Sequence, residues 1–126
     1  MRYLLDTMVL IDHAAGDPVA IALMDRLFEE GHDLYTCDVV TCESLSRGEP
    51  ADLKHIGALL DALEYVSTTP VAARRAGAAR RERHARGGKR VLGDALIAAI
   101  AVDLAATVVT RNRPDFERQG VRTLTY

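Results

Sequence analysis

With 126 residues, 48% of them hydrophobic, the chain is long enough to bury the core of one globular domain. Its net charge of −2 makes no case for nucleic acid by itself, and no stretch approaches the run of about 20 apolar residues that a membrane span needs. Two cysteines, Cys37 and Cys42, are too few for a disulfide framework and are not spaced as a zinc site. The opening residues lack the long apolar run of a signal peptide. We therefore expect one soluble domain over residues 1–126, with free thiols, in a reducing cytoplasm.

The first half of the chain predicts two strands, each followed by helices. A short apolar run that ends at Asp6 has the character of a central strand. The pair Asp17-Pro18 places a helix N-cap directly before a proline at the first helical position. Asp38 is expected to cap a later helix in the same way. The predicted elements are a strand over 2–5, a helix over 7–15, a helix over 18–31, a strand over 34–37, a helix over 38–48 and a helix over 51–63.

The second half continues the alternation of strands and helices. Gly93-Asp94 is interpreted as the start of an apolar helix, and the β-branched run from Thr107 to Thr110 as the buried strand that follows it. Residues 110–116 are polar and turn-like. The other predicted elements are a strand over 65–68, a long basic helix over 70–87 and an edge strand over 121–126. This alternation predicts an α/β fold, a three-layer α/β/α sandwich with a mostly parallel central sheet.

Four carboxylates are placed around the predicted strand ends. Asp6 and Asp115 each follow a strand, Glu43 lies on the helix after the second strand, and Asp94 begins a helix. Because parallel strands end at one edge of a sheet, we expect these side chains to converge there. Four carboxylates in one pocket repel one another unless a cation neutralises them. Oxygen ligands without histidine or cysteine suit Mg²⁺ or Mn²⁺.

Each of these acids also has a simpler explanation when it is taken alone. Asp6 and Asp115 are ordinary turn residues in such positions, Asp94 is an ordinary helix N-cap, and Glu43 is an ordinary solvated helix residue. Only their joint placement favours a site, and the pattern of residue types leaves both interpretations open. Asp12 is expected to be turned away from Asp6 by helical geometry. The four histidines are scattered and show no metal-ligand spacing.

A basic run is the second signal. Half of the chain's 16 lysines and arginines lie between residues 74 and 90, where the only acid is Glu82. Such a run beside an acidic site could hold the phosphates of a nucleic acid, although a solvated helix face is the commoner fate of a charge run. No aromatic residue is interleaved, so base stacking is not indicated. The residues expected to bind nucleic acid are Arg80, Arg81, Arg83, Arg86, Lys89 and Arg90.

Four short motifs resemble those of the PIN-domain nucleases, in order and at the family's spacing. They are Asp6-Thr7-x-Val9-Leu10-Ile11, Thr41-x-Glu43-x-Leu45, Asp94-Ala-Leu-Ile-Ala-Ala-Ile-Ala101, and Val109-Thr110-Arg111-Asn112-x-x-Asp115-Phe116. The size is similar to that of the VapC toxins of VapBC toxin–antitoxin pairs. The resemblance implies an endoribonuclease that depends on Mg²⁺ or Mn²⁺. It also implies that the chain forms a homodimer and binds a small VapB-type antitoxin. It also implies that the metal and catalytic residues are Asp6, Glu43, Asp94 and Asp115, supported by Thr7, Thr110 and Asn112.

Two departures from the family pattern bear on this expectation. Met8 stands where the family often has a small polar residue, and Asn112 stands where many members have an aspartate. The fourth acidic role therefore falls to Asp115 or is shared with a neutral amide. We expect Asp6 and Asp94 to hold a metal directly, with a metal-activated water attacking the phosphodiester.

Three other functions compete with the nuclease. A signalling receiver domain needs a phosphoacceptor aspartate after the third strand, where this chain has Ser67-Thr-Thr69. A phosphatase of the DxD type needs an acid at position 8, which is Met8. The remaining alternative is a catalytically silent PIN fold that only binds RNA or another protein.

Overall fold

A five-stranded sheet forms the centre of the molecule in the computed structural model, which describes residues 1–89 and 91–126. Its strand order is β3-β2-β1-β4-β5, and every neighbouring pair is parallel. In this register Leu4 lies opposite both Tyr35 and Val108. The strands are β1 (Arg2–Leu5), β2 (Asp33–Cys37), β3 (Glu64–Val66), β4 (Thr107–Val109) and β5 (Thr123–Leu124).

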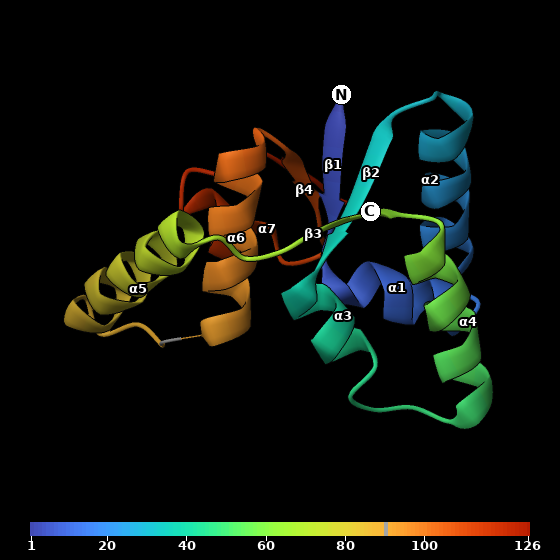
Figure 1. The fold of residues 1–126 in the computed structure, drawn as a ribbon, viewed down its shortest axis with the longest axis horizontal. Coiled ribbons are helices and arrows are strands. Elements are labelled where there is room, and N and C mark those ends of the chain that lie inside the picture. Colours follow the sequence, from blue (N-terminus) through green and yellow to red (C-terminus); the bar gives the residue numbers. More distant parts are fainter. Residues whose placement is uncertain (90) are drawn as a thin grey trace.

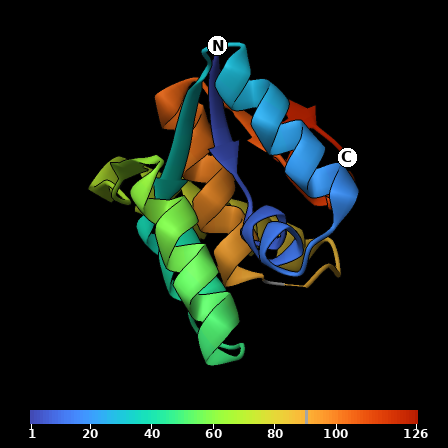
Figure 2. The same cartoon turned by 90° about the vertical axis from the view of Figure 1, so that its right-hand side faces the viewer.

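Helices cover both faces of the sheet, which confirms the predicted three-layer α/β architecture. Figures 1 and 2 show α2 and α6 on opposite sides of β1 and β2. The helices of the described residues are α1 (Thr7–Ala14), α2 (Pro18–Glu29), α3 (Asp38–Ser44), α4 (Pro50–Asp61), α5 (Pro70–Ala85), α6 (Leu92–Leu104) and α7 (Arg113–Glu117). None of them is by itself long and apolar enough to cross a membrane, and only α1 and α2 together, bent by 113°, meet that test by length and composition.

The core lies between the sheet and its two helical layers. Leu4 and Leu5 of β1 are fully buried, as the apolar opening run predicted, and Met24 and Leu27 of α2 pack with them. Phe28, the next residue on α2, is 42% exposed and lies outside this core. The helix α6 is buried over nearly its whole length, because the sheet lies on one side of it and α5 on the other.

One predicted helix cap is confirmed, at Asp17, and one is wrong, at Asp38. Asp17 caps α2 by accepting a hydrogen bond from the Val19 amide at 2.9 Å, with Pro18 at the first helical position. The prediction that Asp38 caps α3 is wrong: the N-cap is Cys37, and the Asp38 carboxylate instead accepts from the Thr68 hydroxyl at 2.9 Å. This bond ties the start of α3 to the segment after β3.

The segment after β4 also differs from its prediction as a simple turn. It contains the short helix α7, and Pro114 occupies the first turn of that helix, where a missing amide hydrogen costs nothing. The helix that was expected to begin at Gly93-Asp94 begins at Leu92, so Asp94 lies within its first turn. Both differences keep the polar side chains at the edge where the parallel strands end. Figure 1 shows α1, α3 and the first turn of α6 meeting there.

Candidate active site

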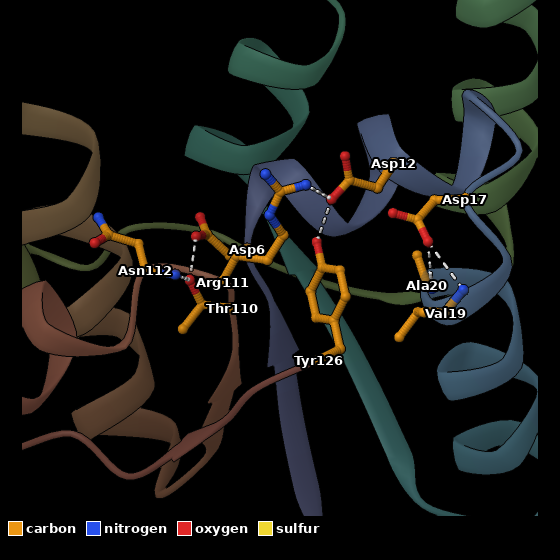
Figure 3. Close-up of polar contacts among 9 residues, drawn as sticks. All are labelled: Asp6, Asp12, Asp17, Val19, Ala20, Thr110, Arg111, Asn112 and Tyr126. Atoms are coloured by element: carbon orange, nitrogen blue, oxygen red, sulfur yellow. Dashed lines mark hydrogen bonds and ion pairs between the residues drawn. The ribbon is translucent and has the colours of Figure 1, made fainter.

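Asp6 lies at the end of β1 and is held by two hydrogen bonds. Its Oδ1 accepts from the Thr7 amide at 2.8 Å. Its Oδ2 accepts from the Thr110 hydroxyl at 2.7 Å, a bond that Figure 3 shows. Burial raises the pKa of Asp6, the bonds from Thr110 and Thr7 oppose that rise, and the nearby Glu43 carboxylate adds to it. Because the side chain is only 6% exposed, its orientation is set by the ends of β1 and β4.

Glu43 reaches the same edge from α3, the helix that follows β2. The Thr7 hydroxyl donates to its Oε1 at 2.8 Å, so Thr7 joins Asp6 to Glu43 through its amide and its hydroxyl. The first turn of α6 lies against the Glu43 carboxylate at Gly93. A Cβ atom at position 93 would overlap the end of the Glu43 side chain, which would then have to move aside, so glycine lets the carboxylate lie this close. The close approach brings the next residue, Asp94, to the cluster.

Asp94 carries the clearest electrostatic signature of the site. Burial, the largest cause, and the negative charges of Asp6, Asp115 and Glu43, in that order of importance, together raise its pKa to about 6. An acid whose pKa responds to three other carboxylates shares one environment with them. The four predicted acids, which come from four separate segments of the chain, are therefore brought together at the edge of the sheet.

Asn112 connects two of these acids. Its side-chain amide donates to Asp115 Oδ2 at 2.6 Å and lies 3.4 Å from Asp94 Oδ2. Its backbone amide donates to the Thr110 hydroxyl at 2.9 Å, which places the loop after β4 against Asp6 as well. Asp115 is also paired with Arg118 at 3.2 Å. Asn112 is thus a hydrogen-bond donor to the acids.

The donor set fits a hard divalent cation. Within residues 1–89 and 91–126, no group of three or more Asp, Glu, His or Cys side chains stands ready to hold a metal ion. Mg²⁺ commonly takes only one or two carboxylates and keeps several waters, so a smaller set is sufficient for it. The pKa of Asp94 is raised by burial and by the carboxylates of Asp6, Asp115 and Glu43, and a bound cation would favour its charged form.

A cavity of about 700 Å³ lies between α5 and α6 and extends to α7; we call it the α5–α6 cavity. Asp94 and Asp115 line one end of it, so it opens onto the acidic cluster. Of the residues predicted to bind nucleic acid, Arg81 does not line the cavity, and Arg90 lies outside the described residues. The predicted basic residues that do line it are Arg80, Arg83, Arg86 and Lys89.

One network of polar residues escaped the sequence analysis. Asp12 is buried on α1, where it accepts from Arg111 Nη1 at 2.8 Å and from the Tyr126 hydroxyl at 2.6 Å (Figure 3). Helical geometry does turn Asp12 away from Asp6, as predicted, but toward the interior. Its position three residues after the buried Val9 was the available signal, because positions three apart share one helix face.

Comparisons with known proteins agree with this geometry. Residues 3–121 match the family model described as PIN domain. The ribonuclease VapC19 of Mycobacterium tuberculosis is 32% identical over 111 residues, which cover 86% of this chain and 87% of the relative.

Solved structures show the same fold at lower identity. The VapBC2 structure from Rickettsia felis, bound to a DNA fragment from its promoter, superposes with a TM-score of 0.84 at 20% identity, covering 100% of this chain and 99% of the matched chain. VapBC-1 from nontypeable Haemophilus influenzae superposes with a TM-score of 0.80 at 19% identity, covering 99% of this chain and 98% of the other. The family model spans nearly the whole sequence, and the chain therefore belongs to the PIN-domain family.

Proposed function

We propose that this protein is a metal-dependent endoribonuclease and the toxin of a toxin–antitoxin pair. The relative VapC19 is a ribonuclease, and the similar solved structures are VapBC assemblies. One observation carries the proposal further than family membership. Carboxylates from four segments converge beside an arginine-lined cavity, and Asp94 has a pKa of about 6 there. Such an uncompensated acidic cluster next to cations matches a site for a divalent cation and a phosphodiester.

The metal would be held by Asp6 and Asp94, with Glu43 and Asp115 beside them. When bound, Mg²⁺ or Mn²⁺ supplies neutralising charge at the phosphate and makes water a stronger acid. Thr7 keeps its amide on Asp6 and its hydroxyl on Glu43, so it holds two of these acids in one orientation.

The donors after β4 support the other side of the cluster. Thr110 is fully buried and donates its hydroxyl proton to Asp6, while Asn112 donates its amide protons to Asp115 and Asp94. These bonds hold carboxylate oxygens in place before any ion or substrate binds. In this proposal Asp115 takes the fourth acidic role, and Asn112 orients the Asp115 carboxylate by donating a hydrogen bond to it.

The partners follow from the same proposal. RNA is the substrate, a small VapB-type protein is the antitoxin, and two copies of the chain form a homodimer. Cys37 and Cys42 are both free, in keeping with action in a reducing cytoplasm. The toxin role is tested by expressing the protein in bacteria. The wild type is expected to arrest growth, and the Asp94→Asn variant is not. Normal growth with active protein would contradict that role.

A cleavage assay with purified protein tests the enzymatic proposal. A fluorescent RNA is incubated with Mg²⁺, with Mn²⁺ or with EDTA, for the wild type, for Asp94→Asn and for the exposed control Asp61→Asn. Cleavage is expected only with a metal, and only in the wild type and the control. Cleavage that survives EDTA, or an unchanged rate in Asp94→Asn, contradicts the proposed site. RNA binding without any cleavage favours the alternative of a catalytically silent PIN module.

A further inference from the structure

The floor of the α5–α6 cavity is apolar, because both helices present alanines to it. Ala95, Ala98 and Ala99 contribute from α6, and Ala78 and Ala79 contribute from α5. Figure 1 shows α5 leaning away from α6 toward its C-terminal end. The small side chains of these alanines leave a cavity between the two helices. A volume of about 700 Å³ is in the range that proteins use to bind small organic groups.

The cavity also holds arginines that lack an anionic partner. Arg80 follows the buried Ala76 by one helical turn, so it lies on the face of α5 that packs toward α6. Its Nε is buried and has no hydrogen-bond partner in the part of the chain that the structure describes. An unsatisfied buried donor costs free energy, and an acceptor on a bound molecule would recover it. Arg86, by contrast, is already paired with Glu82 at 2.7 Å.

A second cation of the cavity, Arg83, is oriented by the turn that follows α5. The Gly88 amide donates to the Arg83 carbonyl at 2.8 Å, and the Arg83 side chain lies across the Gly88 backbone. A Cβ at position 88 would stand 2.5 Å from Arg83 Nε and 2.7 Å from its Cδ, so the Arg83 side chain would have to move if position 88 were not glycine. Arg83 forms no ion pair among the described residues. Its charge therefore remains available to a bound anion.

We propose that the α5–α6 cavity takes one unpaired nucleotide of the RNA, with its base against the alanine floor and its phosphate at Arg80 and Arg83. This inference rests on the proposed function, because Asp94 and Asp115 line the same cavity and an RNA strand leaving it meets the acidic cluster. A paired base cannot enter without being unstacked, so single-stranded or looped RNA is the preferred substrate class.

A nucleotide fits the cavity better than a protein segment does. It combines an anionic phosphate and a flat, weakly polar base in one compact unit, which matches the cations and the alanines that line the same space. A polypeptide would have to supply an acidic side chain for Arg80 and Arg83 and yet avoid the carboxylates of Asp94 and Asp115, which lie at the end of the same cavity.

The test separates the contribution of the base from that of the backbone. Dissociation constants are measured in EDTA by fluorescence anisotropy for a labelled hexamer of uridylate and for an abasic tetrahydrofuran hexamer of equal length. The proteins are the wild type, Ala79→Leu, which fills the cavity, and Ala73→Leu, which adds the same side chain at an exposed position on α5 that does not line the cavity. A further pair, Arg80→Ala and Arg81→Ala, compares a cavity arginine with its outward neighbour.

The wild type and Ala73→Leu are expected to bind the uridylate hexamer roughly tenfold more tightly than the abasic hexamer, because the base buries apolar surface against the alanines. In Ala79→Leu the ratio of the two affinities should fall to about one, while the affinity for the abasic hexamer is unchanged. If Ala79→Leu does not fold, Ala78→Leu is used in its place. Arg80→Ala should weaken binding of both hexamers and reduce the slope of log affinity against log salt by about one, and Arg81→Ala should change that slope less.

The proposed base site is overturned if the wild type and Ala79→Leu show the same ratio of affinity for the uridylate hexamer to affinity for the abasic hexamer. It is also overturned if that ratio is one in the wild type. A change in the oligomeric state of Ala79→Leu, measured by sedimentation, would assign the cavity to contacts between copies and overturns it too. Metal-dependent cleavage is measured in parallel for the wild type. A protein that shows the base contribution but cleaves no RNA would refute the nuclease proposal and leave the nucleotide site standing.

Discussion

Asp6 and Asp12 are equally buried aspartates at the two ends of one short stretch of chain, yet their surroundings are opposite. Asp6 is 6% exposed and Asp12 is 8% exposed. Asp12 has a guanidinium from Arg111 at 2.8 Å and a hydroxyl from Tyr126 at 2.6 Å. Asp6 has only neutral donors, and the charge beside it is the carboxylate of Glu43.

This contrast separates an acid that stabilises the fold from one that we propose to act in the site. A buried carboxylate with a cation is compensated, and its network ties α1 to the segments after β4 and β5. The presence of Asp12 also raises the pKa of Arg111 and, together with burial, that of Tyr126. A buried carboxylate beside other carboxylates costs stability, and the proposed metal ion would relieve that cost.

The largest difference is expected in cleavage. Asp6→Asn should reduce the rate of RNA cleavage by at least about a hundredfold, because it removes a proposed metal ligand and a loss of about 2.7 kcal/mol in transition-state stabilisation corresponds to that factor. Asp12→Asn should lower the rate by less than about tenfold, because it leaves the acidic cluster intact. Single-turnover rates at saturating Mg²⁺ provide the measurement. Equal losses in the two variants would erase the distinction between the two aspartates.

The order should reverse when stability is measured. Asp12→Ala should lower the free energy of unfolding by about 1–3 kcal/mol, since it removes a buried carboxylate that accepts hydrogen bonds from Arg111 and Tyr126. Tyr126→Phe removes one hydrogen bond and should cost about 1 kcal/mol. Asp94→Asn should be neutral or stabilising without metal, because it removes repulsion. Urea denaturation in EDTA measures all three, and an Asp94→Asn variant less stable than Asp12→Ala would contradict the comparison.

The smallest expected effect is on the pH dependence of stability. Because the pKa of Asp94 is raised from 3.8 to about 6, the folded state binds more protons than the unfolded chain between those values. The contribution of Asp94 to stability is therefore most favourable below about pH 4 and is lost as the pH rises through 6. In EDTA, the temperature of thermal unfolding should fall less between pH 5 and pH 7 for Asp94→Asn than for the wild type. Equal falls in the two proteins would count against the raised pKa.

The alternation of strands and helices was predictable because it depends on local periodicity. The apolar run before Asp6 and the repeat along α6 each follow from neighbouring residues, and so does the cap formed by Asp17 and Pro18. Element boundaries were less accurate, since Asp38 has alternative partners that only the fold supplies. Its carboxylate accepts from Thr68, which is distant in sequence, in place of capping its own helix.

The candidate site divides in the same way. The four acids could be named because each follows a strand or opens a helix, and because the motifs resemble a known family. The sequence could not predict three features of the site and its surroundings, since they depend on contacts within the folded chain. They are the contact of Gly93 with Glu43, the hydrogen bond that Asn112 donates to Asp115, and the network around Asp12. The separation of Arg80 from Arg81 also required the structure, because it depends on how α5 packs against α6.

By itself the amino-acid sequence determined the parallel α/β architecture, the membership of a nuclease family and the identity of the acidic residues. These properties follow from residue types at short spacing, where each side chain acts through its own strand or helix. Only the tertiary structure decided which carboxylates are compensated and which arginines face the α5–α6 cavity. Charge compensation and packing depend on distances between segments, and those distances exist only once the sheet has brought the strand ends together.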